Sequence, residues 1–357
     1  MSKAKKIEST DASVTGAASA APACGLGASD APSQEEQSHT CEMLANKTCT
    51  LIFDSCADFA PSVAERLGIE VIHFPYVVDG KEYLDDLWQS QTPHEFYEKM
   101  RKGAQVSTSA VSPGRYYEVF SKAYERGIPA IYFGLTAGLS SSISCAEQAA
   151  EMVRSEHPDF ELYVMDNLLP SATAELFAIE AVRQLNNGLS AAELYEWAKD
   201  ARYFIQGYFT LDNFDALAAG GRIPPAAAQI GGKLDVKPEL SYDLNGSLTL
   251  RGVCRGRRKA LKAILAEFRE NYSHDTSLPV AIVTADAEKD GDWLEAAARK
   301  EPGCEDLVVI RSSISPVIGS HTGPGMVGFG FWAKDRREKM SITDRIARKV
   351  RGSGKEK

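Results

Sequence analysis

The chain has 357 residues, of which 44% are hydrophobic and 25% are charged, a composition typical of a globular protein. Forty Lys and Arg against 49 Asp and Glu give a net charge of −9, which argues against general binding to nucleic acid or to an anionic membrane. The apolar runs are shorter than the ~20 residues of a membrane helix, and the start lacks the apolar core of a secretory signal. With seven cysteines and no close pair among them, we expect a reduced, cytoplasmic protein without an integral membrane segment.

Composition divides the chain into four segments. Residues 1–46 are rich in Ala, Ser, Thr and Glu and nearly free of aromatic residues, so they cannot bury enough apolar surface to fold and are predicted to be a disordered tail. Residues 47–205 and 206–335 are predicted to be two folded domains, because the pattern of strands and helices changes between them. Residues 336–357 are dominated by Lys and Arg and are predicted to be a polar C-terminal tail.

The first folded segment alternates short apolar runs with helical patterns. Alternation of buried strands with helices predicts a parallel, Rossmann-like sheet that is covered by helices. The helix starts are marked by capping boxes at Thr92 and Ser190 and by a proline after Ser112. The predicted strands are Cys49–Phe53, Val71–Val78, Ala130–Leu135 and Glu161–Met165.

The second folded segment has a different pattern. Two alternating runs, Glu239–Asp243 and Ser247–Val253, are joined by Asn-Gly, which predicts a hairpin with a type I′ turn. We expect an α+β domain with a mixed or antiparallel sheet, so the whole chain is predicted to be an α/β protein of two domains. Its further strands are predicted at Val280–Thr284 and Leu307–Ile310, and its helices at Arg258–Asn271 and Trp293–Lys300.

Hydroxyl groups gather where the predicted parallel strands end, which is the edge at which open sheets bind ligands. Thr108-Ser109 precedes the helix at Ser112, and Ser140-Ser-Ser142 opens the helix after Ala130–Leu135. Each cluster alone is explained by helix capping, but several at one sheet edge suit a carboxylate or a phosphate.

The second segment adds a cation and a histidine. Arg222 follows a glycine pair that allows a tight turn, and a guanidinium there can pair with a carboxylate, although a surface arginine after a turn explains it equally well. His321 lies in a Gly/Pro-rich loop, where a histidine is more often a ligand contact than part of a core.

Three kinds of enzyme fit the residues poorly. A serine hydrolase would use Ser140 or Ser141 with His321, but the chain has no G-x-S-x-G motif at these serines. A dinucleotide enzyme would use Gly323–Gly328, a literal G-x-G-x-x-G that too little chain follows to complete a βαβ unit. No compact His, Asp and Glu set has metal-ligand spacing. The residues favour binding of a small anionic molecule, with no catalytic residue, no metal and no tightly bound cofactor.

Six short motifs stand in a specific order along the chain. They are Phe53-Asp-Ser-Cys-Ala-Asp58, Thr108-Ser109, Gly138-Leu-Ser140, Gly220-Gly-Arg-Ile223, Val236-Lys-Pro238 and His321-Thr-Gly-Pro-Gly325. By these motifs and their order the chain resembles the DegV family of bacterial fatty-acid-binding proteins, some of which are the acyl-carrying subunit of a fatty acid kinase. It departs from the family where Ala110 follows Thr-Ser, at Ser141-Ser142, and at Ala219 before the glycine pair.

The resemblance implies a long-chain fatty acid as the ligand, with lipid between and within the two domains. It implies that the carboxylate is held by Thr108, Ser109, Ser140, His321 and Thr322. It also places Arg222 and Arg255 near the carboxylate or on a face that meets a kinase subunit. The expected partners are the fatty acid, a fatty acid kinase catalytic subunit and, transiently, a membrane surface, and the expected state is a monomer. A stand-alone lipid carrier or sensor, and a serine esterase acting through Ser140 or Ser141, remain as alternatives.

Overall fold

The computed structural model describes residues 48–223 and 235–339, so the predicted tail at 1–46 and all but the first four residues of the predicted tail at 336–357 lie outside the described residues. The first half of the chain builds a four-stranded parallel sheet in the order β2-β1-β6-β7, which confirms the predicted parallel sheet. Every residue of its two central strands is buried, because helices cover both faces. The strands are β1 (Thr50–Asp54), β2 (Glu70–Ile72), β6 (Ala130–Gly134) and β7 (Leu162–Asp166).

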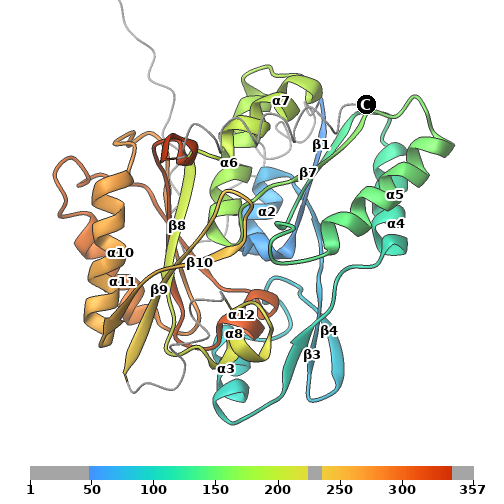
Figure 1. Cartoon of the computed structure of the whole chain (residues 1–357). Helices are drawn as coiled ribbons and strands as arrows, with labels where there is room; N and C mark the ends of the chain where they lie inside the picture. The colour runs from blue at the N-terminus through green and yellow to red at the C-terminus, as the bar shows by residue number, and fades with distance from the viewer. Residues whose placement is uncertain (1–47, 224–234, 340–357) are drawn as a thin grey trace, which may run out of the picture.

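The helices of this half begin at the predicted signals. Both predicted capping boxes form, with the Thr92 and Ser190 hydroxyls accepting from the third helical residue, and the Ser112 hydroxyl caps the next helix in the same way. Outer helices α4 and α5 cover one face of the sheet, while α6 lies toward the second half of the chain (Figure 1). The helices are α2 (Pro61–Leu67), α3 (Pro93–Arg101), α4 (Pro113–Tyr124), α5 (Ser142–Glu156), α6 (Ala172–Asn186) and α7 (Ala191–Ala201), with a 3₁₀ turn at Ser55–Ala57.

The predicted single strand over Val71–Val78 is wrong. The chain leaves β2 at Ile72 and enters β3 (Pro75–Val78), which belongs to a separate antiparallel sheet of order β4-β3-β5. The break has a physical cause, because the Phe74 N–H donates to the Ser55 hydroxyl and Pro75 has no N–H to donate to a ladder. This small sheet was not predicted; its other strands are β4 (Lys81–Leu84) and β5 (Val106–Thr108).

The second half builds a six-stranded mixed sheet in the order β10-β9-β8-β13-β11-β12, which confirms the predicted mixed sheet. Its central strands β8 and β13 were not predicted, and β12 begins two residues and ends three residues after the predicted strand. The strands are β8 (Ile205–Thr210), β9 (Val236–Tyr242), β10 (Leu248–Arg255), β11 (Val280–Thr284), β12 (Val309–Ser313) and β13 (Val327–Trp332). The helices are α8 (Asp215–Ala219), α10 (Arg257–Asn271), α11 (Glu288–Ala298) and α12 (Pro316–Thr322), followed by a 3₁₀ turn at Arg336–Lys339.

The β9–β10 hairpin forms, but its predicted type I′ turn is wrong. That turn needs positive φ at both central residues, and only Gly246 of the Asn-Gly pair has it, at 75°. The Gly246 N–H donates to Asp243 O and the Asp243 N–H donates to Ser247 O, so the loop is longer by one residue. The tip touches the first half of the chain, because a Cβ on Gly138 would lie 2.5 Å from the Ser247 nitrogen.

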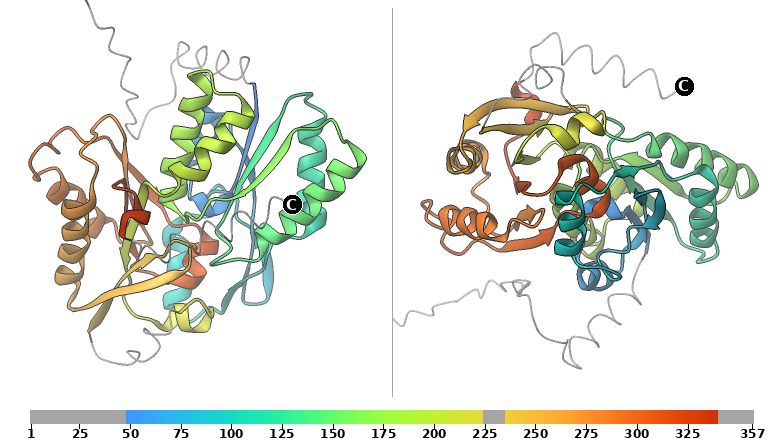
Figure 2. Two further views of the ribbon diagram at one scale, coloured as in Figure 1. Left: turned by 45° about the horizontal axis from the view of Figure 1, so that its top comes forward. Right: turned by 90° about the horizontal axis from the view of Figure 1, so that it is seen from below.

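The apolar interior consists of two clusters, one on each face of the six-stranded sheet. Helices α10 and α11 cover the outer face of the six-stranded sheet, and α4 and α5 lie on the opposite side of the molecule (Figure 2). The main apolar cluster runs from the parallel sheet through α6 to the inner face of the second sheet, and a second cluster lies under α10 and α11. Cys56, Cys145, Cys254 and Cys304 of the described part are free thiols. Within the described residues, no helix combines the length and apolarity needed to cross a bilayer.

Candidate functional site

A cavity lies between the inner face of the six-stranded sheet and the first half of the chain. The empty space within it, including its open mouth, is about 990 Å³. Its walls are mostly apolar, and polar side chains gather at one end. The apolar lining comprises Phe74, Leu135, Leu139, Phe209, Leu217, Leu248, Val283, Val317, Ile318, Met326 and Phe329.

The structure brings six of the seven site residues predicted from sequence to this one cavity. They come from β5 and the residue after it, the β6–α5 loop, the turn after α8, and the end of α12. Arg255 is the exception: it lies exposed on β10, opposite Val236 of β9, and does not line the cavity. The six are Thr108, Ser109, Ser140, Arg222, His321 and Thr322.

His321 and Thr108 form the central polar contact. The His321 Nε2 atom lies 2.8 Å from the Thr108 hydroxyl, and its Nδ1 atom is buried without a hydrogen-bond partner. Burial, with a contribution from the positive charge of Arg222, lowers the pKa of His321 to about 4, so the ring is neutral at pH 7. A neutral ring has one N–H donor. Because a buried N–H without an acceptor is costly, we assign the proton to Nε2, where it is donated to Thr108.

The two glycines of the pair, Gly220 and Gly221, have different roles beside this contact. Gly220 lies under the His321 ring, and a Cβ there would overlap the Nδ1 atom, although its φ of −78° suits any residue. Gly221 has a φ of 68°, and a Cβ there would meet no atom within 4 Å, so this glycine serves the turn. The turn places Arg222, whose Nη1 donates to Gly220 O at 2.6 Å and whose Nε donates to Leu139 O at 3.2 Å. Arg222 therefore ties the two walls of the cavity together.

Ser140 is held by the start of α5. Its hydroxyl donates to the Ser142 hydroxyl at 2.9 Å and accepts from the Ser142 N–H at 3.2 Å. The Ser142 hydroxyl in turn accepts from the Val111 N–H, so the Thr108-Ser109 segment and the Ser140 loop are joined. Ser140 makes this contact with Ser142 while His321 pairs with Thr108, so these side chains are not arranged as a Ser–His nucleophile pair.

Four carboxyl groups of the first half are buried, and two of them, Asp58 and Glu175, accept hydrogen bonds from residues of the second half. Burial raises the pKa of Asp58 to about 7, and that of Asp85 and Glu175 to about 8. The pKa of Asp54 is raised less, to about 6. Asp58 joins the halves directly, because it accepts from the Ser315 N–H at 3.0 Å, at the start of the helix that carries His321.

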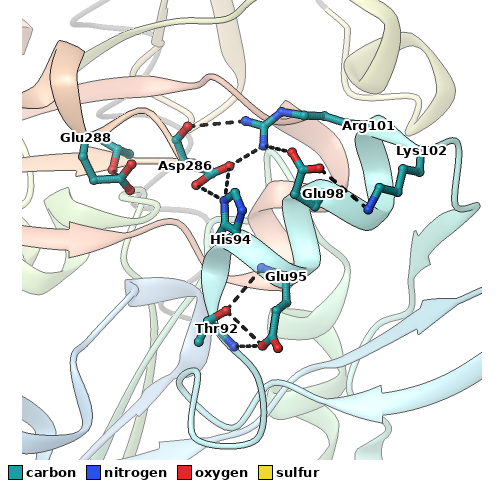
Figure 3. Close-up of polar contacts among 9 residues, drawn as sticks. Thr92, His94, Glu95, Glu98, Arg101, Lys102, Asp286 and Glu288 are labelled. Carbon is teal, nitrogen blue, oxygen red and sulfur yellow. Dashed lines mark hydrogen bonds and ion pairs between the residues drawn. The ribbon is translucent and has the colours of Figure 1, made fainter.

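A separate polar cluster joins α3 to the loop after β11 (Figure 3). His94 Nδ1 lies 3.0 Å from Asp286, and Arg101 pairs with both Asp286 and Glu98. The atoms of His94, Glu98 and Asp286 are close enough to hold a metal ion. Arg101 already supplies positive charge to both carboxylates, and none of these residues lines the cavity. We regard the cluster as a junction between the two halves.

Sequence reasoning missed the residues at the other end of the cavity. Thr173, Tyr242 and two paired glycines, Gly207 of β8 and Gly330 of β13, line it there. The signal was present in Val327–Trp332, where glycines alternate with aromatic residues at the period of a strand and leave one face without side chains.

Comparison with known proteins agrees with this arrangement. Residues 48–334 match a protein family that is described as "Uncharacterised protein, DegV family". A DegV domain-containing protein of Clostridium perfringens is 30% identical over 82% of this chain and 99% of its own length.

Two solved structures share the fold. One is a DegV family protein from Thermus thermophilus, whose structure is described as showing fatty acid binding. It is 26% identical to this chain with a TM-score of 0.70, and the match covers 80% of this chain and 100% of that one. The other is the B3 protein of the fatty acid kinase of Streptococcus pneumoniae, loaded with linoleic acid. It is 20% identical with a TM-score of 0.71, covering 81% of this chain and 100% of that one. The chain belongs to the DegV family.

Proposed function

We propose that this protein binds a long-chain fatty acid, with the carboxylate at the polar end of the cavity and the acyl chain along its apolar walls. The observation that carries the proposal is the single cavity in which six predicted head-group residues meet a long apolar lining. The described fatty acid binding of the Thermus thermophilus relative supports it. Thr108, Ser109, Ser140 and Thr322 would hold the carboxylate, His321 would act on it through the Thr108 hydroxyl, and Arg222 would supply a positive charge beside it.

The neutral state of His321 suits this role. Because its Nε2–H is donated to Thr108, the Thr108 hydroxyl proton is left to donate to a carboxylate oxygen. The Ser140 hydroxyl can turn from Ser142 to the same group, since hydroxyl protons rotate freely. His321 is thus a positioning residue that directs a hydroxyl donor into the cavity. The net charge of the site comes from Arg222.

The energies are consistent with tight binding. An acyl chain of ~14 methylenes gains roughly 11 kcal/mol on leaving water, at about 0.8 kcal/mol for each buried methylene. Loss of translational and conformational freedom offsets part of that gain. A carboxylate that entered the cavity without hydrogen bonds would offset the rest, so the polar end is needed for affinity as well as for orientation.

We assign a binding role and not catalysis. The geometry gives the site donors and a positive charge, and the Ser140 hydroxyl pairs with Ser142 and not with His321. We further propose that the protein presents the bound carboxylate to a fatty acid kinase subunit, which supplies ATP and forms the acyl phosphate. The exposed Arg255 beside the basic start of α10 would meet that subunit. The boundary near residue 205, where β8 begins the second sheet, would divide the two domains that hold the lipid between them.

Ser140→Ala should weaken fatty-acid binding by roughly 10- to 100-fold, because a hydrogen bond to a charged group contributes about 1.5–3 kcal/mol. The measurement is displacement of a fluorescent fatty acid at pH 7. Ser144→Ala is the control, since Ser144 is exposed on α5 outside the cavity. Equal affinity of Ser140→Ala and the unaltered protein would remove Ser140 from the site.

Arg255→Ala should leave fatty-acid affinity unchanged and slow acyl-phosphate formation when a fatty acid kinase catalytic subunit and ATP are added. The reason is that the side chain is exposed and does not line the cavity. Arg115→Ala is the matched control, an exposed arginine on α4. A normal rate for Arg255→Ala would place the kinase face elsewhere. If the added kinase subunit and ATP form no acyl phosphate from the fatty acid bound to the unaltered protein, a stand-alone lipid carrier is favoured.

A further inference from the structure

The long axis of the cavity follows two paired strands of the six-stranded sheet. In the β8–β13 register, Gly207 lies opposite Gly330, and Phe209 lies opposite Gly328. Gly330, Gly328 and Met326 belong to the same face and line the cavity at successive levels. Four residues of strand span roughly 14 Å. The polar end lies beyond Met326, at α8 and α12, so the level of Gly330 is the far end.

In the middle of the cavity, the wall formed by β13 has no side chain at Gly328. A Cβ on Gly328 would have as its three nearest neighbours Met326 Cε and Val283 Cγ1 at 3.1 Å and Phe209 Cβ at 3.5 Å. All three belong to the sheet or to the residue that leads into it, and none comes from across the cavity. Gly328 itself lines the cavity, and its lack of a side chain leaves more room for a ligand at this level than any other residue would.

The far end is closed from across the cavity by Thr173. A Cβ on Gly207 would lie 2.8 Å from Thr173 Cγ2 and 2.9 Å from the Tyr242 hydroxyl, and a Cβ on Gly330 would lie 3.0 Å from the same Thr173 methyl. The Thr173 hydroxyl donates to Pro170 O at 2.6 Å, which fixes the side chain in the first turn of α6. The lining stops at this level, since the next residues on the same face, Ile205 and Trp332, do not line the cavity.

We propose that Thr173 is a specificity-determining residue whose methyl group ends the acyl channel and sets the longest chain that the protein accepts. This inference rests on the proposed binding of fatty acids. Each methylene that is buried before the chain reaches Thr173 should raise the affinity about fourfold. The first methylene beyond that length should add no affinity, because the cavity has no further buried space for it.

Thr173→Ser and Thr173→Val separate the methyl from the hydroxyl. Serine removes the methyl that lies on the glycines and keeps the donor to Pro170, so the longest well-bound chain should grow by about one methylene. Valine keeps a methyl in that place and loses the hydroxyl, so the longest chain should stay the same. Gly328→Ala adds a methyl group in the middle of the cavity, before the end that Thr173 closes. It should therefore weaken the binding of all long chains alike and leave the longest bound chain unchanged.

The experiment loads each full-length variant with an equimolar mixture of saturated fatty acids of graded length and measures the bound chains by mass spectrometry. Thermal unfolding of each variant verifies that it is folded. The inference is supported if Thr173→Ser binds a longer fatty acid than the unaltered protein does and the longest fatty acid bound by Thr173→Val is unchanged. Identical limits for serine and the unaltered protein would overturn it while fatty-acid binding stands. Absence of any fatty acid on the unaltered protein would instead overturn the proposed function, and the inference with it.

Discussion

Gly220→Ala is expected to lower fatty-acid affinity by more than about tenfold, the loss of one hydrogen bond to a charged group. The backbone at Gly220 suits alanine, so the effect comes from space alone. The added Cβ would overlap His321 Nδ1 and lie 3.2 Å from Ala216 O. The imidazole must move, and its Nε2 then leaves Thr108, whose hydroxyl loses the partner that directs it. Titration with a fluorescent fatty acid measures the loss.

Gly221→Ala is the matched control, because the added methyl group strains the backbone at position 221 and contacts no other residue. A Cβ at position 221 has no atom within 4 Å, but the φ of 68° disfavours alanine by about 1–2 kcal/mol. This variant should therefore unfold at a lower temperature and bind fatty acid normally. Normal binding by Gly220→Ala would show that the His321–Thr108 contact does not support the site.

The free energy of unfolding should fall as the pH rises from about 4 to 7. Asp58 has a folded-state pKa of about 7 against an ordinary value of 3.8, so between these values the folded protein keeps a proton that the unfolded chain has released. The stabilisation is complete below pH 3.8 and is lost as the pH rises through 7. A pKa difference of about three corresponds to roughly 4 kcal/mol for this group alone. The physical cause is burial at the junction between the two halves.

Asp58→Asn should flatten that dependence by up to about 1.4 kcal/mol per pH unit, the contribution of one proton. The measurement is urea unfolding at several pH values across this range. Asp159→Asn, at an exposed carboxylate, should leave the slope unchanged. A slope that is the same in Asp58→Asn and in the unaltered protein would mean that Asp58 is ionised in the folded state.

The polar end of the cavity was predictable because it is built from short, ordered motifs. Thr108, Ser140 and His321 are far apart in sequence, and the family resemblance was needed to bring them together. The capping boxes at Thr92 and Ser190 were predictable from local chemistry alone, since a hydroxyl and a carboxylate three residues apart satisfy the same helix start.

The apolar end was not predictable, because it depends on pairing between distant strands. Gly207 and Gly330 form one surface only after β8 pairs with β13, and Thr173 closes it only because α6 packs on that sheet. The strand break at Pro75 was missed for a similar reason. The β-branched and aromatic residues around it suit a strand, and the Ser55 hydroxyl that takes the Phe74 N–H lies outside the local pattern. The literal G-x-G-x-x-G ends at Gly328, inside an antiparallel strand, and not in a βαβ unit.

The most direct test is mass spectrometry of the lipid extracted from the full-length protein after heterologous expression and purification. We predict about one long-chain fatty acid per chain in the unaltered protein and a much smaller amount in Gly220→Ala. An empty cavity in the unaltered protein under these conditions, or a stoichiometric molecule without a carboxylate and an acyl chain, would contradict fatty-acid binding as the function of this site.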